Sequence, residues 1–81
     1  MYKNRSHDGS ANICGKKIRA WRKETRPLMS QRELAQKLQL EGIDLDKNAI
    51  QRIESGKRFV TDLELKAFAK ILGITADELL E

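Results

Sequence analysis

Three copies of one helix-start pattern constrain where a chain of 81 residues can begin its helices. Each copy is a capping box: a Ser or Thr side chain accepts the N–H three residues later, and the Glu at that position accepts the N–H of the Ser or Thr. The boxes are Ser30-Gln31-Arg32-Glu33, Thr61-Asp62-Leu63-Glu64 and Thr75-Ala76-Asp77-Glu78. Apolar residues flank each box at the spacing of a hydrophobic staple. Three helices are therefore predicted to begin directly after residues 30, 61 and 75.

Two further helix starts carry weaker signals. Asp46 is a favourable N-cap residue, and Asn12 can cap a helix that has to end before Pro27. Helix ends are marked by glycines that can adopt the left-handed conformation, at Gly42, Gly56 and Gly73. The apolar and polar residues nowhere alternate as they do in strands. We therefore predict an all-α chain with helices at about 13–25, 31–41, 47–55, 62–72 and 76–80.

Length and composition exclude several classes of protein. The chain has room for one small domain, and no apolar run approaches the roughly 18 residues of a membrane span. The polar N-terminus does not resemble a secretory signal, and the single Cys14 and single His7 are too few for a disulfide or a metal site. We expect a cytoplasmic domain at 12–81 behind a flexible tail at 1–11, without metal, cofactor or enzymatic activity.

The charge is distributed unevenly along the chain. Residues 1–58 contain 14 Lys and Arg against 7 Asp and Glu, whereas residues 59–81 contain 2 against 5. A basic N-terminal two-thirds favours an anionic partner, and nucleic acid is the commonest partner of a small basic domain. The alternative is a well-solvated charged surface that binds no specific partner.

The predicted helix at 47–55 has two chemically different sides. Ile50 and Ile53 form an apolar stripe, and the opposite side is a continuous polar strip of Lys47, Asn48, Gln51, Arg52 and Ser55. Such side chains can contact base edges in a DNA major groove, where Arg suits guanine and Asn or Gln suits adenine. The same strip is also compatible with an ordinary solvated helix face.

Three segments, in this order, resemble the Cro and phage-repressor class of helix-turn-helix proteins, the Xre family. They are Ser30 to Ala35, Ile50 to Arg58 and Ala69 to Ile74. The resemblance covers about residues 13–80 and implies a compact five-helix, lambda-repressor-like domain with 31–41 and 47–55 as the helix-turn-helix. It also implies a bacterial or phage-encoded transcriptional regulator, expected to be a repressor, whose third helix enters the major groove of operator DNA.

The same resemblance assigns roles to individual residues. The base-contacting positions are Lys47, Asn48 and Arg52, with Gln51 beside them. The DNA-backbone positions are Ser30, Gln31, Ser55, Lys57 and Arg58. A structural ion pair is expected between Arg22 and Glu54. The positions that match the family's core are Ile18, Leu34, Ala35, Leu38, Ile50, Ile53, Leu65, Phe68, Ala69 and Leu72.

The link between the second and third helices and the residue Trp21 each lead to a separate expectation. The link between the second and third helices has about five additional residues, 41–45, so we expect Gly42 to end the second helix and Ile43 and Leu45 to fill the adjoining core. Trp21 stands at helical spacing from Ile18 and is expected in the core.

Two functions from different classes remain open at this point. The first is a sequence-specific regulator of double-stranded DNA that acts as a homodimer, with the dimer contact expected at Ile71, Leu79 and Leu80. The alternative is an antitoxin-like or adaptor protein that uses the fold mainly to bind a protein partner. The polar strip and the Lys57-Arg58 pair favour the first function, because an adaptor would not need them.

Overall fold

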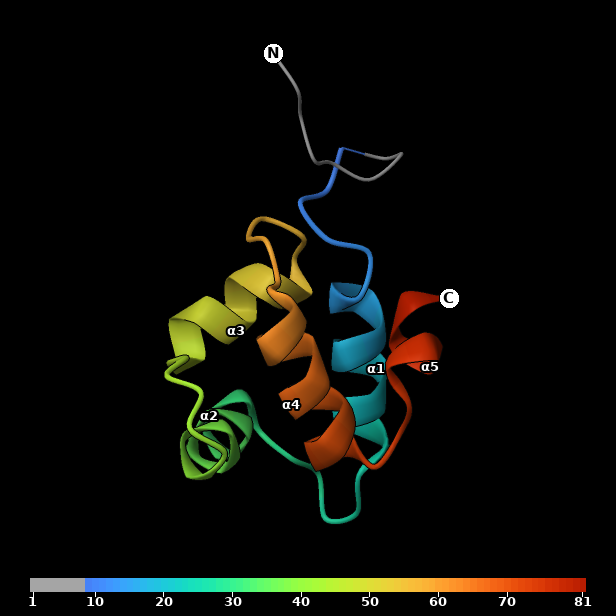
Figure 1. Ribbon diagram of the computed structural model, residues 1–81. Coiled ribbons are helices and arrows are strands. Elements are labelled where there is room, and N and C mark those ends of the chain that lie inside the picture. The colour runs from blue at the N-terminus through green and yellow to red at the C-terminus, as the bar shows by residue number, and fades with distance from the viewer. Residues whose placement is uncertain (1–8) are drawn as a thin grey trace.

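Five helices make up the regular structure of the computed structural model, which describes residues 9–81 (Figure 1). The helices are α1 (Gly15–Glu24), α2 (Gln31–Leu40), α3 (Lys47–Glu54), α4 (Asp62–Leu72) and α5 (Ala76–Leu80). The predicted all-α fold is confirmed, and each predicted helix end lies within two residues of the observed one. His7 and most of the expected tail lie outside the described residues.

The helix starts confirm the capping signals in the sequence. The hydroxyls of Ser30, Thr61 and Thr75 accept the N–H groups three residues later at 3.0, 3.2 and 3.1 Å, and all three capping boxes are complete. The Asp46 carboxylate accepts the Ala49 N–H at 2.7 Å and caps α3. These bonds satisfy N–H groups that have no partner inside their own helix. They therefore fix the residue at which each helix begins.

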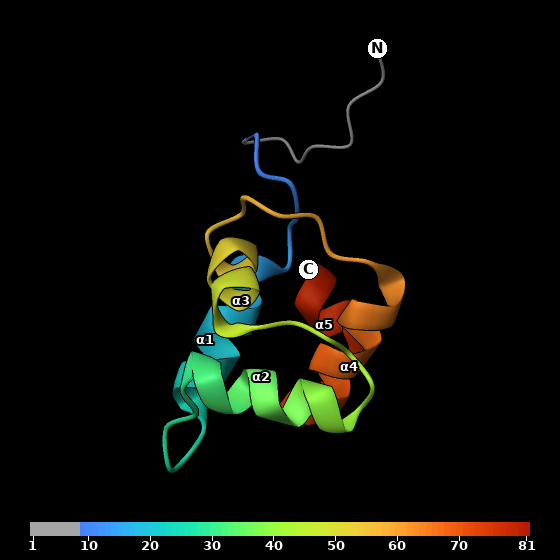
Figure 2. The ribbon, with the colours of Figure 1, turned by 90° about the vertical axis from the view of Figure 1, so that its left-hand side faces the viewer.

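The helices pack so that α3 lies on the outside of the bundle. It contacts both α1 and α2, while α4 contacts α1, α2 and α5. Figures 1 and 2 show α3 at one side of the bundle and α5 at the opposite side, with α2 running across the end of α3. One side of α3 is consequently left uncovered by the other helices.

The core is built from side chains of all five helices and of the loops between them. Its largest completely buried members are Phe68, Ile18, Leu34, Leu38, Ile50, Ile53 and Leu79. Of the expected core residues, Ala35, Leu65 and Leu72 are only partly buried but pack against this cluster, so the expected core is confirmed.

Two expectations about apolar side chains are wrong. Trp21 is 37% exposed, because α1 turns Gly15, Ile18 and Arg22 toward the core and leaves position 21 at the edge of that face. Leu79, expected at a dimer contact, is completely buried in the core; of the two other residues expected there, Ile71 is partly buried against the core and Leu80 is 42% exposed.

The additional residues between α2 and α3 are absorbed as expected. The helix ends at Leu40, Gly42 takes the left-handed conformation with φ of 81°, and the Ile43 N–H donates to the Leu38 carbonyl at 2.9 Å. Leu45 is buried and Ile43 packs partly buried against the core. The added segment thus contributes side chains to the core.

Two negative observations apply to residues 9–81. None of the helices there is both long and apolar enough to traverse a lipid bilayer. In the same part of the chain, no three His, Cys, Asp or Glu side chains are grouped so that they could hold a metal ion.

Candidate nucleic-acid interface

The uncovered side of α3 presents the polar strip predicted from the sequence. All five side chains of the strip, Lys47, Asn48, Gln51, Arg52 and Ser55, are exposed. Ile50 and Ile53, on the opposite side of the helix, are completely buried. Within residues 9–81 the side chains of Lys47, Asn48, Gln51 and Arg52 make no hydrogen bond or ion pair, and Ser55 only donates to the Arg52 carbonyl at 3.1 Å. The strip therefore has its donors and acceptors available for a ligand.

A buried ion pair holds the inner side of α3 against α1. The Arg22 guanidinium donates to the two carboxylate oxygens of Glu54, from Nε at 2.8 Å and from Nη2 at 2.9 Å. Its Nη1 donates to the Met29 carbonyl at 2.9 Å. Both residues are only 7% exposed, and the hydrogen bond to Glu54 raises the pKa of Arg22 above its ordinary value against the opposing effect of burial. The pair joins α1, α3 and the segment before α2.

Gln31 connects this ion pair to the start of α2. Its Nε2 donates to Glu54 Oε1 at 3.1 Å, so the Gln31 side chain is half-buried rather than free above the helix. Ser30, the neighbouring backbone-contact candidate, is exposed, with its hydroxyl engaged in the capping box. Three elements thus meet at the Glu54 carboxylate, and they set the orientation of α3.

Asn12 holds the same C-terminal end of α3 from the segment before α1, a role that the sequence did not indicate. Its Nδ2 donates to the carbonyls of Ile53 at 3.0 Å and Arg58 at 2.7 Å, while its Oδ1 accepts the Gly15 N–H at 2.7 Å. Ala11, at the end of the expected tail, is buried and donates to the Gly56 carbonyl at 2.7 Å. Asn12 was expected only as the N-cap of the first helix, but the N-cap residue is Cys14, and Asn12 instead accepts the N–H of the first helical residue, Gly15, from two positions further back.

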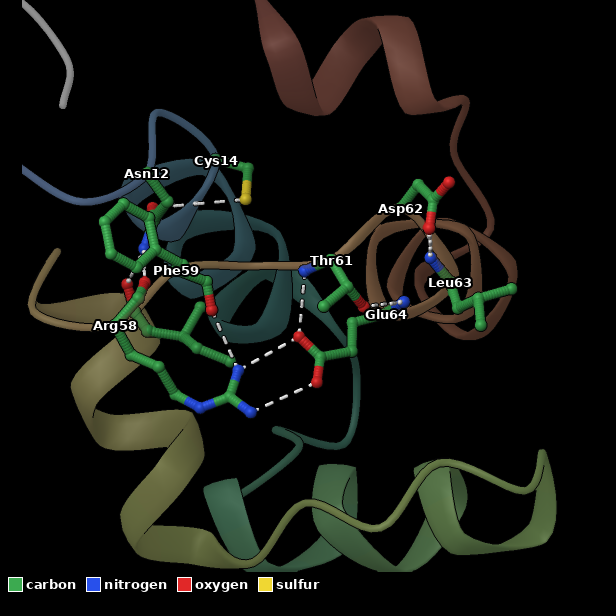
Figure 3. A network of polar contacts seen from close by, with 9 residues as sticks. Asn12, Cys14, Arg58, Phe59, Thr61, Asp62, Leu63 and Glu64 are labelled. Atoms are coloured by element: carbon green, nitrogen blue, oxygen red, sulfur yellow. Dashed lines mark hydrogen bonds and ion pairs between the residues drawn. The ribbon is translucent and has the colours of Figure 1, made fainter. Parts of the chain in front are cut away.

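The loop after α3 places its two basic residues differently. Lys57 is exposed, and its side chain makes no hydrogen bond or ion pair within the described chain. Arg58 instead pairs with Glu64 of α4, from Nη1 to Oε1 at 3.0 Å and from Nη2 to Oε2 at 3.1 Å, and also donates to the Phe59 carbonyl (Figure 3). Lys57 therefore has the freer positive charge of the two.

The same network changes the pKa of Glu64. Burial raises the pKa, but hydrogen bonds from Arg58 and from the Thr61 backbone, together with the Arg58 charge, lower it below its ordinary value. Thr61 N donates to Glu64 Oε1 at 3.0 Å, so one carboxylate serves both the helix cap and the ion pair (Figure 3). The capping-box pattern accounted for Glu64 by its role at the helix start, so the sequence did not indicate that the same carboxylate also pairs with Arg58.

A five-helix bundle with an exposed polar strip on its third helix defines a helix-turn-helix DNA-binding protein of the Xre/Cro-like class. Comparison with family models agrees, since the helix-turn-helix family matches residues 18–79. The chain belongs to this family and is a DNA-binding helix-turn-helix regulator. Searches of curated proteins and of solved structures found no match to the chain.

Proposed function

We propose that this protein is a sequence-specific regulator of double-stranded DNA whose α3 lies in the major groove and whose binding represses transcription. The observation that carries the proposal is the contrast between the two sides of α3. The inner side is fixed by buried contacts of Ile50, Ile53 and Glu54, whereas the outer side presents four polar side chains without partners in the described chain. A rigidly held helix with free donors and acceptors suits base recognition.

The strip supplies the chemistry of base recognition. Arg52 has the planar fork that donates twice to guanine O6 and N7, and Asn48 and Gln51 can each pair with adenine N6 and N7. Lys47, in the first turn of α3, adds a further donor for guanine.

Phosphate contacts would position the strip in the groove. Lys57 supplies a free ammonium beside the end of α3, and Ser30 and Gln31 stand at the start of α2, where unpaired backbone N–H groups favour a phosphate. Ser55 is at the end of the strip. Arg58 uses three N–H groups on Glu64 and Phe59, which leaves it a weaker backbone contact than Lys57.

We propose a homodimer, because one short helix contacts too few base pairs to select a site. An apolar groove of ≈180 Å³ between the segment before α1 and the end of α5 is lined by Ile13, Val60, Leu65 and Leu80. Leu80 is 42% exposed and Ile13 54%, so a second copy would bury them. In such a dimer the two α3 helices would be about 34 Å apart, matching successive major grooves. Sedimentation showing a monomer both free and on its DNA site would contradict this arrangement.

Selection from a random duplex library, followed by a salt titration, tests the proposed function. If each subunit neutralises about four phosphates, log affinity should fall with log salt at a slope near −7 for the dimer, at about −0.9 per phosphate. An enriched palindromic sequence with this slope is expected. A slope near zero, or no enriched sequence, would contradict the proposal. A reporter assay tests repression. With the enriched site placed over a promoter, reporter output should fall only when the protein is present.

A protein partner is the second candidate function, and a different surface favours it. Leu40 is 85% exposed and Leu63 68%, and Leu63 and Ile43 line a groove of ≈440 Å³ between α4 and the loop after α2. This surface is independent of the α3 strip. An antitoxin-like role would therefore predict a variant, Leu63→Ser, that loses a protein partner but retains DNA affinity.

A further inference from the structure

A row of cationic side chains follows the side of α1 that adjoins α3. Lys16, Arg19 and Lys23 are spaced three and four residues apart, which places them on one face of the helix, and all three are exposed. Together with Ala20 and Glu54, they line a hollow of ≈350 Å³ beside α3. The sequence analysis assigned no role to this row.

Arg19 links the row to the polar strip. A second hollow of ≈250 Å³ is lined by Arg19 of α1, Gln31 at the start of α2, Gln51 and Ser55 of the α3 strip, and Glu54. Residues from all three helices that meet at Glu54 therefore border one depression on the DNA-facing side. Arg19, Gln51 and Ser55 line the same hollow, so a ligand that contacts Gln51 or Ser55 there also lies close to Arg19.

The charge balance of the two hollows taken together is positive. Their one acidic lining residue, Glu54, is buried and already paired with Arg22. The Arg19 and Lys23 side chains make no ion pair or hydrogen bond within residues 9–81. Two exposed cations beside a neutralised carboxylate attract an anion rather than a base edge.

The geometry points to a further phosphate-binding site: Arg19 and Lys23 bind the phosphodiester backbone that borders the major groove on the α1 side of α3. This inference rests on the proposed function and extends it, because it adds a DNA contact outside the helix-turn-helix. The α1 row and Lys57 would then contact the backbone at different places around α3, and the row would contribute affinity without sequence preference.

Single-charge variants test the inference on the selected duplex and on a scrambled one. Arg19→Gln and Lys23→Gln should each make the salt slope shallower by about one unit per subunit, on both duplexes. Raising the salt from 50 to 200 mM weakens binding of the wild-type protein by a certain factor. For a variant that lacks one phosphate contact per subunit, that factor should be about three- to four-fold smaller for each subunit. Arg19→Lys keeps the charge and should retain the wild-type slope.

Lys66→Gln is the matched control, because it removes the same charge from an exposed residue of α4 that lines the groove between α4 and the loop after α2. Phosphate-ethylation interference locates the contact. Ethylation of the phosphate bound by Arg19 should weaken binding of the wild-type protein but should not further weaken binding of Arg19→Gln. If Arg19→Gln and Lys23→Gln match Lys66→Gln in slope and interference pattern, the inference is overturned while the proposed function stands. If the wild-type protein binds no duplex, both are overturned.

Discussion

Glu64 accepts a bidentate ion pair from Arg58 and, through the same carboxylate, the backbone N–H of Thr61. One side chain thereby connects the loop after α3 to the first turn of α4. The network fixes the loop that carries Lys57, and it does so through a charge that can be removed by protonation.

Acid should weaken this connection. The pKa of Glu64 is lower in the folded protein than its ordinary value of 4.5, so its charge stabilises the fold above that pH and the contribution is lost as the pH falls through the folded pKa. Glu64→Gln keeps one oxygen for the Thr61 N–H but removes the charge and the second oxygen that accepts from Arg58. At neutral pH the variant should lose about 0.5–1 kcal/mol of unfolding free energy.

Urea unfolding at several pH values measures this effect. The wild-type protein should lose stability more steeply than Glu64→Gln below pH 4.5, so that the two unfolding free energies converge in acid. Parallel curves for the two proteins throughout this range would show that the Glu64 charge does not stabilise the fold.

Base contact and backbone contact should separate at two residues of the site. Arg52→Ala should cost about 1–3 kcal/mol on the selected duplex and much less on scrambled DNA, because only the selected site offers a matched guanine. Lys57→Ala should weaken both duplexes similarly and make the salt slope shallower by about one unit per subunit. Neither change should alter the melting temperature, since both side chains are exposed. Equal weakening of both duplexes by Arg52→Ala would refute base contact by that residue.

Breaking the buried ion pair should affect folding before it affects binding. Glu54→Ala leaves the Arg22 guanidinium buried with only the Met29 carbonyl as an acceptor within residues 9–81, and such a loss costs about 3–5 kcal/mol. The double variant Arg22→Met/Glu54→Leu removes both charges and should be more stable than Glu54→Ala. Chemical denaturation of the three proteins gives the comparison. A double variant less stable than Glu54→Ala would contradict this account of the pair.

Asn12 offers a nearly isosteric test of the contacts behind α3. Asn12→Asp keeps an oxygen to accept the Gly15 N–H but removes the donor that serves the Ile53 and Arg58 carbonyls. The cost should be about 1–3 kcal/mol, because two carbonyls then face a carboxylate. Thermal unfolding measures it, with Asn48→Asp on the exposed strip as the control for the charge. Equal melting temperatures for the two variants would show that Asn12 does not fix the helix.

The sequence predicted the helices well because their boundaries depend on local chemistry. Each cap bond joins one residue to the N–H three positions later, so the local sequence pattern directly indicates the contact. This holds for Ser30, Asp46, Thr61 and Thr75. Helical spacing also placed Ile50 and Ile53 on the buried side of α3.

Contacts between distant segments were harder to predict. Asn12 and Ile53 are 41 positions apart, and nothing in either local pattern indicates that the α3 carbonyls need a donor. Trp21 was wrongly predicted to lie in the core. Both position 21 and position 22 are at helical spacing from Ile18, and the spacing alone does not tell which of the two is buried. The hollow beside Arg19 required knowing that α1, α2 and α3 converge on Glu54. Tertiary packing, not propensity, decided these three cases.

The two sides of α3 separate structural residues from those proposed to contact DNA. The residues that hold the helix in place, Ile50, Ile53 and Glu54, are distinct from those on its outer strip. Substitutions at Lys47, Asn48, Gln51 and Arg52 remove no internal hydrogen bond within the described chain. Under the proposed function, new operator preferences are accessible by exchanging these four side chains on an unchanged scaffold, in evolution and in the laboratory alike.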